Sequence, residues 1–297
     1  MTTHPLTGVW TELVTPFSHT LQIDFPSIRR LVDAQAAHGI QGIYIHGISA
    51  ETLSMTEKEQ VELVAAGVKA ADGRIPVMAN LMCAGKARAL ELLDAFAGCG
   101  ASYICASQPL LFPCGEEALF DYFAEIIRRA PVPVCLYNMP QAGYTVPPRL
   151  VGRLARTFPN FLGYKDSTQN IIHLQSVMGE VERTDFSVLA GSDATFYATL
   201  AVGGAGIVSL ISLIFPDLIT GLYDAWQRGD HKAAFQRQLF VMKVRDALKS
   251  APLIAGYKTM VRHLALFETD LVRAPLSSAS QGQAEALLRQ LESLGVI

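Results

Sequence analysis

The chain has 297 residues, of which half are hydrophobic and 17% are charged, and its formal net charge at pH 7 is −3. Disordered, collagen-like and coiled-coil proteins have compositions far from this one, so these classes are excluded. Because Lys and Arg form no cluster, the chain has no electrostatic footprint for nucleic acid or an anionic membrane. We therefore expect a small-molecule partner, no nucleic acid and no membrane.

The N-terminal sequence and the cysteines both indicate a cytoplasmic protein. The opening stretch MTTHPLTGVWTELVTPF has no basic segment followed by an apolar run, so no secretory signal is expected. No apolar stretch reaches the roughly 18 residues that a membrane span needs. The five cysteines contain no C-x-x-C pair, and we expect them to be free thiols in a reducing compartment.

Short β-rich runs recur along the chain, and a helical pattern follows each of them. The runs are GVWTELV from Gly8, GIYIHG from Gly42, PVMANL from Pro76, SYICAS from Ser102, PVCLYN from Pro133, FLGYKD from Phe161, SVLAGS from Ser187 and GIVSLI from Gly206. Their spacing of roughly 20 to 35 residues is what one strand, one helix and two short loops occupy. Several runs are apolar throughout, as in a parallel sheet covered by helices on both faces.

The segments between these runs carry helix signals. Ser27 is predicted to cap a helix that ends near Gly39, and Thr56 and Glu59 have the spacing of a capping box. A doubly wound open sheet would give the same alternation of strands and helices. However, no G-x-G-x-x-G fingerprint follows the first run, where a dinucleotide-binding fold would carry it. The pattern therefore favours a TIM-type (β/α)8 barrel.

Residues 216–297 contain more helix than one barrel unit requires. Helical periodicity covers Tyr223 to Trp226, Lys232 to Leu248 and Gln283 to Leu294, and no linker separates them from the barrel. We predict a barrel over residues 1–215. The last barrel helix and a C-terminal helical extension then occupy 216–297, and the whole chain forms one structural unit.

A barrel's active site lies at the C-terminal ends of its strands, and Lys165 closes the sixth run there. Desolvation at an apolar barrel mouth predicts a lowered pKa for this lysine. A neutral amine can attack a ketone, and the resulting Schiff base is an electron sink that lets a neighbouring bond break. A structural lysine paired with Asp166 or another carboxylate would look the same in the sequence.

Two further features accompany this lysine. Tyr137 closes the fifth run, so its hydroxyl is expected near the Lys165 amine as a proton shuttle, unless it is a core tyrosine bonded to a carbonyl. The turn Gly47-Ile48-Ser49 follows the second run, and its amides with the Ser49 hydroxyl can hold a substrate carboxylate. An ordinary capped turn would look the same.

No metal site or cofactor is expected. The seven histidines are scattered and form no H-x-x-x-H pair or carboxylate cluster with ligand spacing. His46, next to the turn, is interpreted as structural. Chemistry through Lys165 alone is the simpler hypothesis.

The ordered set of motifs resembles the dihydrodipicolinate synthase / N-acetylneuraminate lyase family of class I aldolases. The motifs are G-x-[ST]-x-E at Gly47 to Glu51, Y-N-x-P at Tyr137 to Pro140, G-x-K-[DE] at Gly163 to Asp166, G-x-D at Gly191 to Asp193 and GG-x-G-[IV]-[IV]-S at Gly203 to Ser209. The similarity covers essentially the whole chain. It implies a (β/α)8 barrel with a C-terminal helical extension, Schiff bases with pyruvate or related 2-oxo acids, and a homo-oligomer, either a dimer or a tetramer.

The resemblance also implies roles for individual residues. Lys165 matches the Schiff-base lysine and Tyr137 the catalytic acid/base. The expected substrate-binding residues are Ile48 and Ser49 in the carboxylate-binding turn, the Val208 backbone after the eighth run, and Ser167, Gly191 and Asp193.

The chain departs from the family at positions that bear on the substrate. The synthases pass protons through a turn hydroxyl and a tyrosine after the fourth strand, whereas Ile48 and Leu111 stand here and neither can carry a proton. Ala142 replaces an arginine that grips the second substrate of the synthases. Ala194 replaces a carboxylate expected in lyases of sialic acid. These changes argue against both activities and favour an uncharged second substrate portion.

We therefore predict a Schiff-base-forming lyase, an aldolase or a dehydratase, acting on pyruvate or a 2-oxo-3-deoxy acid. Aldol cleavage and dehydration pass through the same imine, so the sequence does not separate them. Two alternatives stay open. The first is 4-hydroxy-tetrahydrodipicolinate (dihydrodipicolinate) synthase with a rearranged relay, and the second is a non-catalytic barrel that binds a 2-oxo acid.

Overall fold

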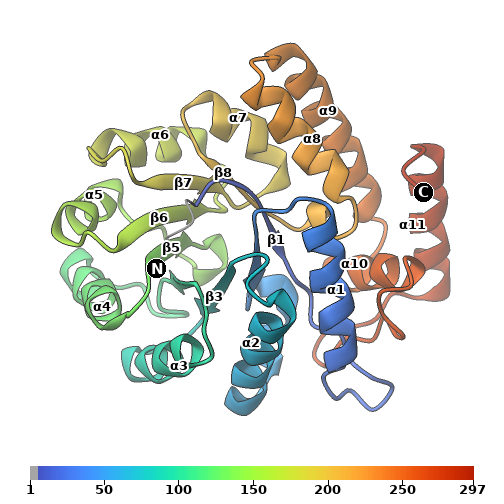
Figure 1. The fold of residues 1–297 in the computed structure, drawn as a ribbon, viewed down its shortest axis with the longest axis horizontal. Coiled ribbons are helices and arrows are strands. Elements are labelled where there is room, and N and C mark those ends of the chain that lie inside the picture. Colours follow the sequence, from blue (N-terminus) through green and yellow to red (C-terminus); the bar gives the residue numbers. More distant parts are fainter. Residues whose placement is uncertain (1–5) are drawn as a thin grey trace.

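The computed structural model describes residues 6–297, and its centre is a closed barrel of parallel strands (Figure 1). The strands are β1 (Gly8–Glu12), β2 (Gly42–Ile45), β3 (Val77–Leu81), β4 (Tyr103–Ser107), β5 (Val134–Asn138), β6 (Phe161–Asp166), β7 (Ser187–Ala190) and β8 (Gly206–Ser209). Each strand pairs with its neighbour in sequence, and β8 pairs with β1 to close the barrel. The predicted barrel is confirmed, and the open sheet is excluded.

Helices surround the barrel and cover the outer faces of its strands (Figure 1). They are α1 (Phe25–Ala37), α2 (Glu57–Ala71), α3 (Lys86–Gly98), α4 (Glu116–Arg129), α5 (Pro148–Thr157), α6 (Ile171–Glu180), α7 (Phe196–Ala201) and α8 (Pro216–Gln227). With helices outside and side chains filling the inside, every strand residue except Leu162 is buried. This two-sided burial explains why most strand residues are apolar.

Of the two predicted N-caps, that of α2 is confirmed and that of α1 is wrong. Thr56 and Glu59 form the predicted capping box at the start of α2. Helix α1 begins one turn earlier than predicted, because Asp24 is its N-cap and its carboxylate accepts from the Ser27 amide. Pro26, inside the first turn, has a fixed φ and lacks an amide that would need a cap, so the helix starts before it.

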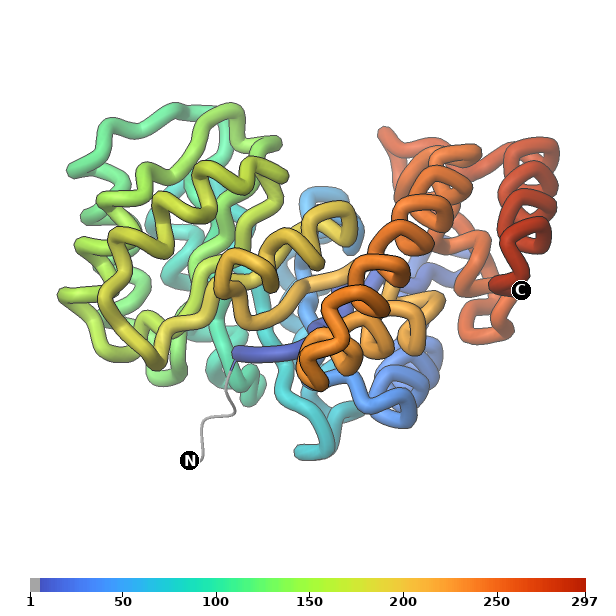
Figure 2. Tube along the Cα trace, turned by 90° about the horizontal axis from the view of Figure 1, so that it is seen from above, coloured from blue at the N-terminus to red at the C-terminus, as the bar shows by residue number. Residues whose placement is uncertain are grey.

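Three more helices lie together on one side of the barrel, coloured orange to red in Figures 1 and 2. They are α9 (His231–Leu248), α10 (Leu253–His263) and α11 (Gln281–Ser293). Helix α10 was not predicted. Residues 255–261 of α10 are all buried, yet they include Gly256, Lys258 and Thr259, which do not look like a buried helix face in the sequence. No helix within residues 6–297 is long and apolar enough to cross a membrane.

Aromatic and aliphatic side chains fill the barrel interior below the strand ends. Trp10 packs edge to face on Tyr103 with ring centroids 5.6 Å apart, and Tyr44 packs likewise on Tyr137 at 6.4 Å. All four rings are buried. Because the interior is solid, a small molecule can be bound only above it, at the C-terminal ends of the strands.

Candidate active site

A cavity of about 260 Å³ lies at the C-terminal ends of the strands. All of the predicted site residues except Lys165 line it, namely Ile48, Ser49, Tyr137, Ser167, Gly191, Asp193 and Val208. Lys165 lies next to this cavity, because it is the direct partner of Tyr137 in the pairing of β5 with β6. The structure thus brings together residues from five different strand ends.

Lys165 is almost completely buried, with 1% of its surface exposed, and its ammonium has three close neighbours. The Nζ atom lies 4.0 Å from the ring centroids of both Tyr44 and Tyr137. The third neighbour is the carboxylate of Glu12, whose Oε2 lies 3.6 Å from Nζ. Glu12 is the last residue of β1 and lies 8% exposed at the bottom of the cavity.

These neighbours reverse the pKa shift predicted for Lys165. Burial lowers the pKa of the amine, but electrostatic interactions with Tyr137 and Glu12 raise it, and the balance lies above the ordinary value of a lysine. The prediction of a lowered pKa was therefore wrong. It considered desolvation alone, since the sequence does not show that Glu12 faces Lys165 across the barrel.

The Tyr137 hydroxyl points to a serine, and not to a backbone carbonyl as in the core-tyrosine alternative. Its oxygen lies 3.2 Å from Oγ of Ser167, which is itself 3.0 Å from the carbonyl oxygen of Gly191. A Cβ on Gly191 would stand 2.1 Å from that Oγ, so only glycine leaves room for Ser167. Burial raises the pKa of the Tyr137 phenol, although the charge of Lys165 opposes the shift.

The turn after β2, where a substrate carboxylate is expected, binds a carboxylate of the protein itself. Residues 48–50 form a single 3-10 turn, and the Ser49 amide donates to Oε1 of Glu12 at 3.0 Å. A Cβ on Gly47 would stand 2.1 Å from the same oxygen. Gly47 therefore gives the Glu12 side chain the space to reach the turn.

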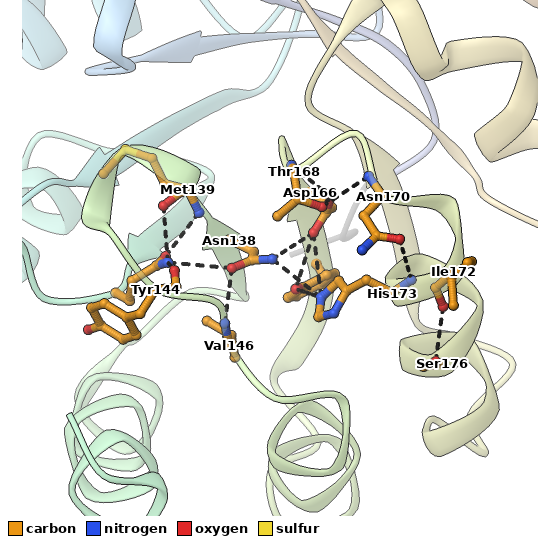
Figure 3. A network of polar contacts seen from close by, with 12 residues as sticks. Asn138, Met139, Tyr144, Val146, Asp166, Thr168, Asn170, Ile172, His173 and Ser176 are labelled. Atoms are coloured by element: carbon orange, nitrogen blue, oxygen red, sulfur yellow. Dashed lines mark hydrogen bonds and ion pairs between the residues drawn. The ribbon is translucent and has the colours of Figure 1, made fainter. Parts of the chain in front are cut away.

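Asp166 is not the partner of Lys165. Its Oδ2 accepts from Asn138 Nδ2 at 2.7 Å and lies 3.6 Å from His173 Nε2, while its Oδ1 accepts from the Thr168 amide at 2.9 Å. Asn138 in turn accepts from the Val146 amide at 3.1 Å, so the network joins the loops after β5 and β6 (Figure 3). These contacts hold the two strand ends that carry Tyr137 and Lys165.

Asp193 connects the loops after β7 and β8. Its carboxylate accepts from the Ser209 hydroxyl and from the amides of Leu210 and Ile211, the latter two at 3.4 Å. Its backbone carbonyl accepts from Gln238 of α9 at 2.8 Å. The side chain thereby positions the segment that follows Val208, and its contact with substrate stays a prediction.

The loop after β4 lines a different, more apolar cavity of about 600 Å³. Leu111 has a φ of +73° and is 79% exposed, whereas Ala142 is buried. Leu110 and Leu111 lie in this second cavity with Met82, and it shares Ile48 with the first. The loop after β4 therefore belongs to a neighbouring apolar cavity.

Three charged residues that line the cavity were not predicted from the sequence, namely Glu12, Arg245 and Lys249. The signal for Glu12 was a single carboxylate within the otherwise uncharged run GVWTELV, near the C-terminal end of the first strand. Arg245 of α9, Lys249 directly after α9 and Tyr257 of α10 also line the cavity. No signal pointed to them, because a helix's periodicity does not show which strand end it covers. Within residues 6–297, no three His, Cys, Asp or Glu side chains gather as a metal site requires.

Comparison with known proteins agrees with this geometry. The model of the dihydrodipicolinate synthetase family matches residues 5–294. The chain belongs to this family. As a member of it, the protein is a lyase of the class I aldolase type.

Similar proteins span nearly the full length of the chain. A 4-hydroxy-tetrahydrodipicolinate synthase of Maridesulfovibrio salexigens is 31% identical over 98% of this chain and 99% of its own. An uncharacterized DapA-like lyase of Thermococcus onnurineus is 30% identical over 90% and 95%. The crystal structure of a prophage protein of the same family from E. coli K12, in complex with pyruvate, matches with a TM-score of 0.94 and 25% identity over 98% and 99%.

Proposed function

We propose that the protein is a Schiff-base-forming lyase, an aldolase or a dehydratase, acting on pyruvate or a 2-oxo-3-deoxy acid through an imine on Lys165. The observation that carries this proposal is a buried lysine at the end of β6, between two tyrosine rings beside a cavity. The pyruvate bound in the similar E. coli protein supports the substrate class.

The proposed reaction needs a neutral lysine and a group that moves protons. The amine of Lys165 attacks the carbonyl carbon of the 2-oxo acid, the oxygen leaves as water with the two hydrogens of the amine, and uptake of one further proton gives a protonated imine. The imine then accepts the electron pair of an adjacent C–C or C–H bond to give an enamine. Tyr137, whose ring lies 4.0 Å from Nζ, exchanges the proton as the enamine forms or collapses.

The substrate is oriented by the residues that line the cavity. The amides of Ile48 and Ser49 with the Ser49 hydroxyl receive its carboxylate, and the Val208 backbone contacts the three carbons nearest the imine. The remaining expected contacts, to substrate hydroxyls, come from Ser167, Gly191 and Asp193. Arg245 and Lys249 at the same cavity supply positive charge near the far end of a longer substrate.

A second candidate is 4-hydroxy-tetrahydrodipicolinate synthase, which the names of similar proteins favour. Ile48 and Leu111 cannot carry the protons of the synthase relay, and Ala142 cannot grip an acidic second substrate. We therefore rank this activity second.

A substrate panel separates the candidates. Purified protein is assayed with 2-oxo-3-deoxy acids for pyruvate release and for loss of water, and with pyruvate plus aspartate semialdehyde for condensation. We expect turnover of a 2-oxo-3-deoxy acid that Lys165→Ala abolishes and that replacement of the exposed Lys232 by Ala leaves unchanged. Condensation alone would establish the synthase. Pyruvate binding without any turnover, unaffected by Lys165→Ala, would indicate the non-catalytic barrel.

We also propose that the enzyme is a homo-oligomer, a dimer or a tetramer, in which residues 1–215 and 216–297 form one structural unit. Leu53, Leu111 and Phe112 are 67%, 79% and 68% exposed, and large apolar side chains at such exposure are typical of a subunit interface. A monomeric dihydrodipicolinate synthase variant shares the fold with a TM-score of 0.93 at 25% identity. A cytoplasmic location is supported by five free cysteines.

A further inference from the structure

Glu12 is placed between the two groups that Schiff-base formation uses. One oxygen of its carboxylate, Oε1, accepts the Ser49 amide at 3.0 Å, and the other, Oε2, lies 3.6 Å from Lys165 Nζ. The side chain reaches this position because Gly47 has no Cβ. It lines the same cavity as Tyr137, so it can reach a bound substrate as well as the lysine.

The groups that face Glu12 come from four elements, and only one of them is a cation. Tyr44 of β2, Tyr137 of β5 and Tyr257 of α10 each interact electrostatically with its carboxylate. Lys165 of β6 is the cation. Burial raises the pKa of all three phenols, so at neutral pH they keep their protons and cannot act as bases.

The lysine therefore needs a proton acceptor before it can attack. Its ammonium form is favoured in the free enzyme, and an ammonium has no lone pair for the carbonyl carbon. Neither Ile48 nor Leu111 can pass a proton. The nearest anion is the Glu12 carboxylate.

We propose that Glu12 is a further catalytic residue, the base that takes a proton from Lys165 as the 2-oxo acid binds. This inference rests on the proposed function. The ammonium of Lys165 gives one proton to Glu12, and the neutral amine forms a C–N bond to the carbonyl carbon. A second proton leaves the nitrogen of the adduct. Both protons end on the departing oxygen, which leaves as water, and the imine keeps the third.

The same proton transfer makes room for the substrate carboxylate. Before transfer, the Glu12 side chain occupies the Ser49 amide, and two carboxylates at one donor repel each other. Once protonated, Glu12 is uncharged and can donate a hydrogen bond to the substrate carboxylate, which then accepts the amide. The positive charge on Lys165 is lost in the same step, so the net charge of the site does not change.

The test is the rate at which pyruvate becomes trapped on Lys165 by borohydride after rapid mixing, measured from pH 6 to 9. Three variants are compared with wild type: Glu12→Gln, Glu12→Asp and, as a matched control, Glu182→Gln at an exposed position. Glutamine keeps an oxygen for the Ser49 amide, and circular dichroism with thermal melting checks the fold. Should Glu12→Gln not fold, Glu12→Ala with added formate replaces it.

The expected result is a rate about 10²- to 10⁴-fold lower in Glu12→Gln at neutral pH, as for loss of a general base, with partial recovery in Glu12→Asp or with formate. If Glu12 acted only through its charge, Glu12→Gln would change the rate of adduct formation in the opposite direction. Removing the carboxylate also lowers the pKa of Lys165 and frees its amine, so adduct formation would become faster.

A rate in Glu12→Gln that equals or exceeds wild type overturns the proposal. The proposal is also overturned if Glu12→Gln forms the adduct more slowly by the same factor at every pH and neither Glu12→Asp nor added formate restores the rate. That result would mean that Glu12 only positions its neighbours. Failure of wild type to form any adduct would refute the proposed function itself, whatever Glu12 does.

Discussion

The protonation state of Lys165 depends on the side chains that surround it. Lys165 is buried, which lowers its pKa, yet electrostatic interactions, among them that with the Glu12 carboxylate, shift the balance back toward the ammonium. In the proposed reaction, the resting enzyme therefore holds Lys165 protonated. Substrate binding must supply the change that releases the amine.

Removal of the Tyr137 hydroxyl tests the proton shuttle. Tyr137→Phe keeps the ring over Lys165 but loses the oxygen that lies 3.2 Å from Ser167. We expect kcat to fall about 10²- to 10⁴-fold with little change in thermal stability. Tyr122→Phe is the control, because the Tyr122 hydroxyl is buried on α4 with no hydrogen-bond partner among residues 6–297. Equal activity in the two variants would contradict the role of Tyr137.

Because of His46, we expect the folded protein to become less stable in acid. It is fully buried, its Nε2 lies 2.8 Å from the Gln60 carbonyl oxygen, and burial lowers its pKa from 6.5 to about 4. Between pH 6.5 and 4, His46 is protonated in the unfolded chain but not in the folded chain. The free energy of unfolding therefore falls as the pH falls from 6.5 to 4. The loss is on the order of 3 kcal/mol.

Urea unfolding at pH 7 and pH 4.5 measures this effect. In His46→Asn the stability should depend less on pH than in wild type, since asparagine tolerates the φ of +69° and does not titrate. A similar variant of the exposed His19 serves as the control. Identical pH dependence in wild type and His46→Asn would contradict the assignment.

The site could be predicted in part at this scale. Lys165 and Tyr137 were found because the end of a strand fixes where a side chain stands in a barrel. Glu12 and the direction of the lysine's pKa were missed, because contacts across the barrel depend on which strand ends face each other. That arrangement is a property of the closed sheet and cannot be read from one strand.

Among the elements, the C-terminal extension and the turn after β2 are joined by a buried ion pair. Lys258 of α10 pairs with Glu51, and both side chains are fully buried. The other oxygen of Glu51 accepts the Arg273 amide at 2.7 Å, and the Arg273 guanidinium pairs with Glu59 at the start of α2. The extension thereby holds the turn that carries Ile48 and Ser49.

Breaking this pair should cost stability. Lys258→Met leaves the Glu51 carboxylate buried without its partner, and we expect unfolding free energy to fall by about 3 to 5 kcal/mol in urea titrations. The double variant Glu51→Gln, Lys258→Met removes both charges and should lose less than the single variant. Additive losses in the double-mutant cycle would show that the two side chains do not interact.

Most elements could be predicted, for physical reasons that also explain the failures. The strands were found because burial on both faces makes them predominantly apolar, and most helices because one face is apolar. Helix α10 was missed because its buried residues include Lys258 and Thr259, which do not look like a buried helix face in the sequence. The start of α1 was misplaced because the cap was assigned to Ser27, one turn after Asp24.

For the whole molecule, the barrel and its extension together form the candidate site, because strand ends, α9 and α10 all line its cavity. The exposed apolar side chains Leu53, Leu111 and Phe112 lie outside that cavity. We expect light scattering coupled to size exclusion to give the mass of two or four chains, because subunit contacts would cover these side chains. The mass of a single chain across micromolar concentrations would contradict this.

The most direct test of the central claim, that Lys165 forms an imine with a 2-oxo acid, is peptide mass spectrometry after reduction. Wild-type protein is incubated with pyruvate, reduced with borohydride and digested. The account predicts one reduced pyruvate on the peptide that contains Lys165, and none in Lys165→Ala. An unmodified Lys165 peptide, or an adduct on another buried lysine such as Lys258, would contradict it.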